Sequence, residues 1–180
     1  MAAGRIMAAA LALALAQAGT ASAQGADGPF AGFKHDRSEP IEITSDALEV
    51  RQAEELAIFS GAVIAGQGTL RLEADRVEVS YDQEESSGDT GAIKKMRAEG
   101  NVFLTNGAET AKGAWAEYDV VSGMMFMGGS DNAAVILTQG NNAISGQRLV
   151  INLNDGTGRM EGGAKGRVKS LFAPAQTQQN

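Results

Sequence analysis

The chain has 180 residues, of which 43% are hydrophobic and 5% aromatic, and it carries a formal net charge of −7 with one histidine and no cysteine. This charge argues against a nucleic-acid partner, and the lack of cysteine excludes a disulfide framework and a thiolate metal site. The length predicts one domain with a single core.

The N-terminal segment has the features of an export signal. Arg5 is followed by an apolar run over residues 6–18 and then by Ala21-Ser22-Ala23, a small-residue cleavage motif. The alternative is an uncleaved membrane anchor, but a spanning helix needs roughly 20 predominantly apolar residues. We therefore expect residues 1–23 to be a signal peptide cleaved after Ala23, and the mature protein to be soluble in a bacterial periplasm.

The two ends of the remaining chain lack any periodic pattern. Residues 24–39 mix Gly, Asp and Pro, and residues 173–180 are mostly polar. Such composition is typical of segments outside a packed core. We expect a flexible leader over 24–39, a folded domain over 40–172 and a polar tail over 173–180.

Residues 61–82 predict two β-strands joined by a turn. Their apolar positions, among them Leu70 and Leu72, alternate with charged ones, which is the period of a half-buried strand. Gly66-Gln67-Gly68 separates two such runs and predicts a tight hairpin.

A related pattern recurs along the domain. Asp46 and Asp75 each precede an alternating run, with looser counterparts at residues 113–118 and 146–151. Each run is followed by a glycine, and these four glycines are spaced 39, 29 and 33 residues apart: Gly61, Gly100, Gly129 and Gly162. Units of this size cannot bury their apolar faces alone and must stack on one another. The sequence therefore predicts an all-β protein with one long core.

The chain offers no convincing reactive site. Its single histidine, His35, lies in the leader, and adjacent carboxylates such as Glu54-Glu55 would point to opposite sides of a strand. The acidic stretch 82–91 lacks the spacing of a calcium loop, and no helical pattern follows the glycine-rich stretch 156–166. We expect no enzyme activity, no metal and no cofactor.

The apolar positions that alternate inward could form either an ordinary core or a lining that admits an acyl chain. Burying about twelve methylenes would contribute on the order of 10 kcal/mol before ordering costs. The positions predicted to face inward are Ile41, Ile43, Leu48, Val50, Ile58, Val63, Leu70, Leu72, Val77, Val79, Met96, Val102, Leu104, Tyr118, Phe126, Leu149 and Ile151, with Met124, Met125 and Met127 in the same run as Phe126.

Three motifs together carry a resemblance to a known family. EPIEITSD at 39–46, FSGAV at 59–63 and QGTLRLEADRV at 67–77 resemble the opening of the LptA/OstA family of lipopolysaccharide transport proteins, and AEGNV at 98–102 repeats the second motif. The similarity extends over residues 39 to about 160. It implies a twisted, slightly open antiparallel β-jellyroll that binds the lipid A part of lipopolysaccharide and joins similar jellyrolls end to end in a bridge across the periplasm.

The resemblance also implies site residues and partners. The expected lipid-binding interior is Ile41, Ile43, Phe59, Val63, Leu70, Leu72 and Val77, which match the motifs, together with Val79, Val102, Leu104, Tyr118, Leu149 and Ile151. Ile41 and Ile43 on the first strand are expected to meet an LptC-like inner-membrane protein. The far edge, facing an LptD-like outer-membrane translocon, is expected at Arg148, Leu149, Val150, Ile151 and Leu153 and near Met160.

Two alternatives remain open at this stage. The chain could be an LptC-like or LptD-like jellyroll, although the first keeps a membrane helix and the second continues into a large barrel. It could also be a structural β-repeat protein with a dry core that binds no lipid.

Overall fold

The structure, a computed structural model, describes residues 28–34, 36, 38–82, 92–164 and 166–173. Within these ranges the only helical segments are two short 3-10 turns, which confirms the prediction of an all-β protein. The predicted signal peptide with Ala23, His35, residues 83–91 of the acidic stretch and residues 174–180 of the tail lie outside the described residues. The elements in chain order are η1 (Ala31–Phe33), β1 (Ile41–Thr44), β2 (Ala47–Arg51), η2 (Gln52–Glu54), β3 (Leu56–Gln67), β4 (Leu70–Asp82), β5 (Ala92–Thr105), β6 (Glu109–Asp119), β7 (Met124–Gly128), β8 (Val135–Gln139), β9 (Asn142–Gly146), β10 (Arg148–Asn152), β11 (Thr157–Glu161) and β12 (Lys169–Leu171).

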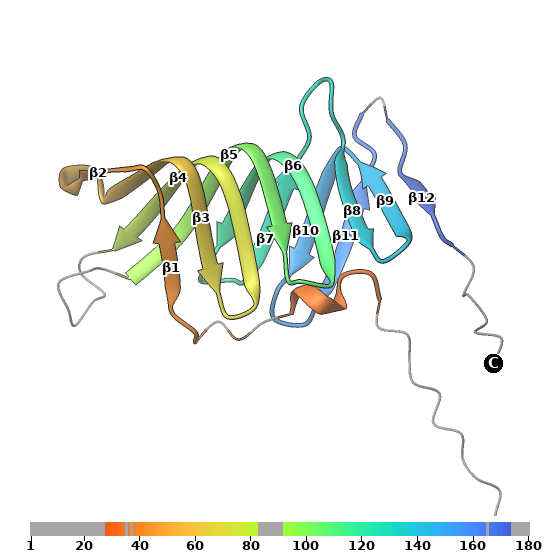
Figure 1. Cartoon of the computed structure of the whole chain (residues 1–180), viewed down its shortest axis with the longest axis horizontal. Helices are drawn as coiled ribbons and strands as arrows, with labels where there is room; N and C mark the ends of the chain where they lie inside the picture. The colour runs from red at the N-terminus through yellow and green to blue at the C-terminus, as the bar shows by residue number, and fades with distance from the viewer. Residues whose placement is uncertain (1–27, 35, 37, 83–91, 165, 174–180) are drawn as a thin grey trace, which may run out of the picture.

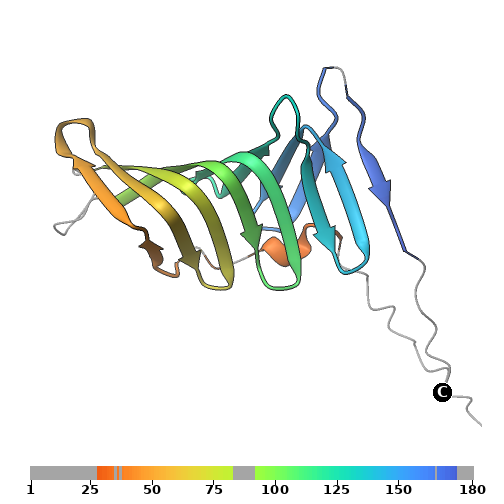
Figure 2. The same cartoon turned by 45° about the horizontal axis from the view of Figure 1, so that its top comes forward.

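All strand pairs are antiparallel, and they form two facing walls that share the long strands (Figures 1 and 2). One half of each long strand belongs to each wall. The first wall runs β2, residues 56–60 of β3, 76–82 of β4, 92–99 of β5, 115–119 of β6, β7, β10 and β11. The second runs β1, residues 63–67 of β3, 70–74 of β4, 102–105 of β5, 109–112 of β6, β8, β9 and β12. This arrangement is the expected open jellyroll.

Paired residues with positive φ mark the corner where a strand passes from one wall to the other. Gly61 and Ala62 have φ of +79° and +43°, and Gly100 and Asn101 have +77° and +47°. The register of the neighbouring strand shifts at both places, which is the signature of a β-bulge. A bulge bends its strand and strengthens the local twist, so β3 and β5 contribute to both walls without interruption.

The recurring Asp-and-Gly pattern of the sequence is explained at these corners. The Asp46 N–H donates a hydrogen bond to the Gly61 carbonyl over 3.0 Å. A β-carbon at Gly61 would overlap the Asp46 carboxylate, and one at Gly100 would overlap the Asp75 carboxylate. Each corner therefore places an aspartate against a glycine of the next strand, where no other residue fits.

The hairpin predicted at Gly66-Gln67-Gly68 lies slightly later in the chain. β3 continues to Gln67, which pairs with Leu70, and the turn consists of Gly68 and Thr69. Gly68 has φ of +57°, and a two-residue hairpin of type II′ favours glycine at this first central position. The shift matters because it turns the Gln67 side chain into the interior.

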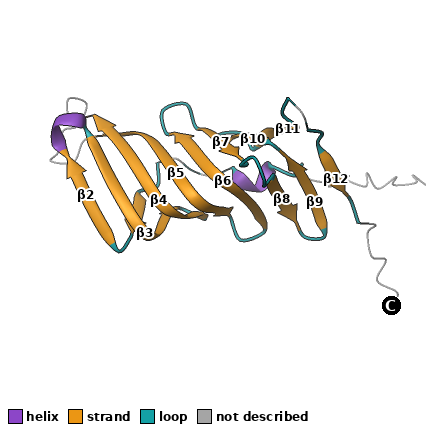
Figure 3. Cartoon of the chain, turned by 90° about the horizontal axis from the view of Figure 1, so that it is seen from above, coloured by secondary structure: helices purple, strands orange, loops and turns teal. Residues whose placement is uncertain are grey.

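Beyond β6 the strands no longer cross the corner in one piece. The chain breaks after β7, between β9 and β10, and after β11, so each wall receives short separate strands (Figure 3). Backbone hydrogen bonds connect the breaks, since the Gly129 N–H donates to the Gln147 carbonyl over 2.9 Å and the Gln147 N–H to the Glu161 carbonyl over 2.7 Å.

Candidate functional site

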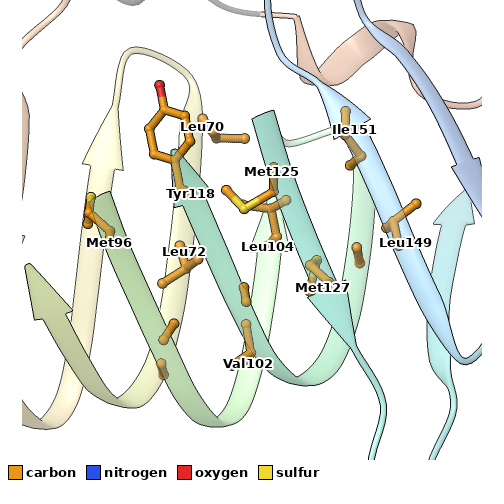
Figure 4. Close-up of a cluster of buried hydrophobic side chains, with 14 of the residues drawn as sticks. Leu70, Leu72, Met96, Val102, Leu104, Tyr118, Met125, Met127, Leu149 and Ile151 are labelled. Carbon is orange, nitrogen blue, oxygen red and sulfur yellow. The ribbon is translucent and has the colours of Figure 1, made fainter. Parts of the chain in front are cut away.

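The space between the walls is the principal apolar hollow of the described residues. Its cavity volume is about 40 Å³, which is well below the roughly 300 Å³ or more of a typical small-molecule pocket, so it would have to widen to take a ligand of that size. Figure 4 shows the surrounding side chains pointing toward one another from both walls. The hollow is lined by Ile41, Ala65, Gly66, Gln67, Leu70, Leu72, Val77, Met96, Ala98, Leu104, Ala116, Tyr118 and Met125, so it occupies the half of the molecule that begins at β1.

The structure places the predicted interior residues together between the walls. Ile41, Ile43 and Phe59 are half-buried and pack against the core, and the others are buried members of one hydrophobic cluster: Val63, Leu70, Leu72, Val77, Val79, Val102, Leu104, Tyr118, Leu149 and Ile151. At these positions the alternation of apolar and polar residues therefore predicted the inward face. That these residues bind lipid stays a prediction.

The inward assignment was wrong at Phe126. On β7 the buried residues are Met125 and Met127, so Phe126 faces outward. The Arg148 guanidinium lies 5.2 Å from the centre of the Phe126 ring, a cation–π contact on the outer surface. Because β7 is apolar on both faces, its sequence could not show which face is buried.

We call the whole apolar space between the two walls the trough. The edges of β1 and β2 form one end of it. Among the described strands, each of them pairs only with β3, as expected for Ile41 and Ile43 on an edge. Leu48 and Val50 of β2 were predicted to be buried, but they are 56% and 58% exposed. They pair with Phe59 and Ala57, which pack against the core, so the apolar inner face of the wall continues to an uncovered rim.

The other end is not where the sequence predicted. Residues 148–152 form β10, which pairs with β7 on one side and β11 on the other, so Arg148, Leu149, Val150, Ile151 and Leu153 are not an outer edge. The local pattern identified a strand but could not show that a further strand, β11, follows it. The outer edges at this end belong to β11, which contains Met160, and to β12. Leu171 and Phe172 are each 66% exposed there.

A buried glutamine connects the walls at the mouth of the hollow. Tyr118 of the first wall donates its hydroxyl hydrogen to Gln67 Oε1 of the second over 3.3 Å, and Gln67 Nε2 donates to the Glu39 carbonyl over 2.9 Å. Gln67 is only 6% exposed, and buried amides of this kind need such partners. The sequence analysis treated Gln67 as a turn residue and missed this role.

The carboxylate of Glu109 is a second buried polar group. It lies at the start of β6, on the side of the molecule where the β5–β6 turn meets residues 28–34, which we call the open side. Glu109 is 2% exposed and accepts hydrogen bonds from Gln139 Nε2 over 2.7 Å and Asn106 Nδ2 over 3.3 Å. Gly32 of the leader covers it, because a β-carbon at Gly32 would lie 2.5 Å from Glu109 Oε2.

The leader is therefore part of the domain, at least over residues 28–34. Phe33 is completely buried in the core cluster and Phe30 packs against it. The prediction of a flexible leader is wrong for this turn, because two phenylalanines in a segment without periodicity give no sequence signal of burial.

The outer surface of the walls is charged. Ion pairs such as Arg76–Glu78 at 2.7 Å and Arg97–Glu99 at 2.9 Å join residues two apart on one strand, and their side chains are exposed. Exposed pairs contribute little stability, but they keep this surface polar. Within the described ranges, no cluster of three or more His, Cys, Asp or Glu side chains could hold a metal ion.

Residues 42–157 match the family described as LptA/(LptD N-terminal domain) LPS transport protein. The chain belongs to this family. Its members are lipopolysaccharide transport proteins and not enzymes, which confirms the expectation of no enzyme activity. The resemblance noted in the sequence is therefore a true family relationship.

Two similar proteins extend this result. An uncharacterized protein of Rhizobium meliloti (strain 1021) is 29% identical over 165 residues, which cover 91% of this chain and 87% of that protein. The crystal structure of LptH, the LptA-homologous periplasmic component of the lipopolysaccharide transport device of Pseudomonas aeruginosa, has a TM-score of 0.63 and 18% identity. The match covers 77% of this chain and 99% of LptH. No helix within the described ranges has the length and apolar character to cross a membrane.

Proposed function

We propose that this protein is a periplasmic bridge that binds lipopolysaccharide and carries it from the inner to the outer membrane. The observation that carries the proposal is an apolar hollow between two walls whose strands end in unpaired edges. Family membership supports the lipid class, and the periplasmic LptH shares the fold. The predicted signal peptide supports export to the same compartment.

The acyl chains of lipid A are the part of lipopolysaccharide whose chemistry matches the apolar lining of the hollow. Leu72, Met96, Leu104 and Met125 offer it methyl and thioether groups from both walls. Each buried methylene contributes about 0.8 kcal/mol, and methionine side chains adapt to chains of different shape. The sugar and phosphate groups remain outside, because the lining supplies few polar partners.

The strand edges at the two ends suit partners of the same architecture. Unpaired N–H and C=O groups on an edge accept an additional strand from a neighbour. The β1 and β2 end fits an LptC-like inner-membrane protein, and the β11 and β12 end fits an LptD-like translocon. The same two ends also allow copies of this chain to join head to tail, with Leu48 and Val50 of one copy meeting Leu171 and Phe172 of the next.

Photo-crosslinking tests whether lipid enters the hollow. A photoreactive residue at Leu72, which points inward, should form adducts with lipopolysaccharide. The same probe at Arg71, its exposed neighbour on β4, is the matched control and should form few. Equal labelling at both positions, or labelling at Arg71 alone, would mean that the core is dry and that the chain is a structural β-repeat protein.

A further inference from the structure

The leader turn is seated in the part of the trough that has no hollow. Phe33 is buried and belongs to the same hydrophobic cluster as five buried residues of the C-terminal half: Val135, Leu137, Leu149, Ile151 and Leu153. The hollow, in contrast, is lined by residues of β1 and β3–β7. Figure 1 shows the leader segment that contains η1 passing beside β10, and Phe33 adds a large apolar side chain to the core cluster.

The turn is approached closely from both sides, and each close approach involves a glycine. A β-carbon at Gly156 would lie 2.9 Å from the Ala31 Cα, and one at Gly158 would lie 2.8 Å from the Phe30 Cγ, so the β10–β11 hairpin approaches the leader closely. On the other side, Gly32 lies against Asn106 and Glu109 at the end of the β5–β6 hairpin. The turn therefore spans the open side between the two walls.

The turn is held by side chains and not by the sheet ladder. Within the described residues its backbone hydrogen bonds are internal, from the N–H groups of Ala31, Phe33 and Lys34 to the carbonyls of Gly28, Phe30 and Ala31. Lys34 also contributes to the lowered pKa of Asp155 through its positive charge, although hydrogen bonds from Thr157 are the larger cause. The turn can leave its seat without breaking a strand pair.

We propose that the Phe30–Phe33 turn is a built-in plug that occupies the C-terminal half of the trough in place of an acyl chain, and that lipid loading displaces it. This inference rests on the proposed function. Moving Phe33 out of the core costs free energy, because its side chain becomes exposed and a void remains. An acyl chain that enters from the hollow beside Met125 would fill that void and lower the cost. The turn would exchange between a seated state and a displaced state, and a ligand that binds only the displaced state shifts this equilibrium toward it. Lipid loading is therefore coupled to displacement of the turn.

Spin labels report the position of the turn directly. The chain has no cysteine, so Lys34→Cys with Arg159→Cys gives one unique pair between the leader and β11, and both positions are exposed. The distance between the labels, measured by pulsed electron resonance, should be short and narrow without lipid. It should become longer and broader when lipopolysaccharide is added. The control pair Lys112→Cys and Arg159→Cys, which lies wholly in the walls, should change less.

The same samples separate the two proposals. Adducts at Leu72 together with an unchanged distance between the leader and β11 would overturn the plug and leave the lipid-binding function standing. No adducts at Leu72 would overturn both, because the plug is defined by exchange with lipid.

Substitution of Phe33, the buried side chain that anchors the turn, provides a second test. Phe33→Ala should lengthen the distance between the leader and β11 in lipid-free protein, and a photoreactive residue at Leu149 should then label lipopolysaccharide several-fold more than in the wild type. Phe33→Leu, which keeps an apolar anchor, should restore both readouts. A lengthened distance without any gain of labelling at Leu149 would show that the turn is merely a structural lid.

Discussion

The two halves of the jellyroll form the same pair of walls in different ways. From β3 to β6 each strand crosses the corner in one piece and bends there, at a glycine bulge in β3 and β5. From β7 to β12 the walls are supplied by short separate strands joined by loops. The first half encloses the hollow, whereas the second is filled by its own side chains and by Phe33.

This difference shows that the same pair of walls can enclose a hollow in one half and be filled in the other. The hollow is lined mainly by the long bent strands, and the filled part lies among the short ones. Side chains that pack closely lose more contacts on truncation than side chains that border a void. We therefore expect substitutions in the two halves to have different effects.

The largest expected effect is the difference in unfolding free energy between a Leu→Ala substitution in the filled half and one beside the hollow. Leu149→Ala should lower the free energy of unfolding by about 4 kcal/mol, because Leu149 is fully buried and leaves a cavity. Leu72→Ala should cost about 2 kcal/mol, since Leu72 already borders empty space and loses fewer contacts. Urea unfolding of both variants measures the difference, and equal costs would contradict the contrast between the halves.

The next effect concerns the corner of the long strands. Gly100→Ala should cost about 3 kcal/mol, because an alanine at φ of +77° is strained and its β-carbon overlaps the Asp75 carboxylate. Gly107→Ala is the control, with φ of +96° and no atom within 4 Å of the added carbon, and should cost about 1 kcal/mol. Thermal unfolding measures both. The double variant Gly100→Ala with Asp75→Ala should recover part of the stability that Gly100→Ala loses. If it does not, overlap with the Asp75 carboxylate is not the cause of the loss.

An effect on association is expected at the uncovered rim. Leu48→Lys should weaken head-to-tail association of the purified protein by about tenfold, which corresponds to about 1.4 kcal/mol, while stability changes by about 0.5 kcal/mol or less. Glu49→Lys changes charge on the opposite face of the same strand and should leave association nearly unchanged. Sedimentation equilibrium measures both, and identical behaviour of the two variants would argue against apolar docking at this end.

The smallest effect is a pH dependence at Asp119, where β6 ends and the turn to β7 begins. The Ser122 N–H donates to Asp119 Oδ1 over 2.8 Å, and this hydrogen bond, with that of the Ser122 side chain, lowers the pKa of Asp119 below its ordinary value of 3.8. A lowered pKa in the folded state gives stability that is present above pH 3.8 and is lost as the pH falls through the folded-state pKa.

The contribution is small because this carboxylate is close to solvent. Asp119→Asn should reduce the free energy of unfolding at pH 7 by about 0.5 kcal/mol or less. The gap between wild type and variant should shrink as the pH falls below about 3.8. A gap that stays constant under acid would assign the effect to side-chain geometry instead of charge.

The sequence predicted what depends on local alternation. Leu70, Leu72, Val77 and Val79 lie on the inward face because a strand with one polar side can be oriented only one way. The sequence did not predict that β10 is an internal strand. The alternation within a strand carries no information on how many neighbouring strands pair with it. β11, read as TGRME, has little apolar alternation and gave no sign that it would cover β10.

The buried leader turn could not be predicted for a different reason. Phe30 and Ala31 lie against Gly158 and Gly156, which are far away in the chain, and no periodicity in residues 24–39 marks the turn. The same applies to Gln67, whose partners Tyr118 and Glu39 are distant in sequence. Sites built from contacts across the open side remain hidden until the walls are in place.

The Asp-and-Gly corners set the increments in which this architecture can change length. An insertion of one residue between a corner and its hairpin turn would reverse the face of every later position on that strand and expose its apolar side. Only the addition or loss of a whole hairpin, carrying its own aspartate and glycine, preserves the pattern. Evolution or design can therefore extend such a jellyroll stepwise, one hairpin at a time, without redesigning the strands already present.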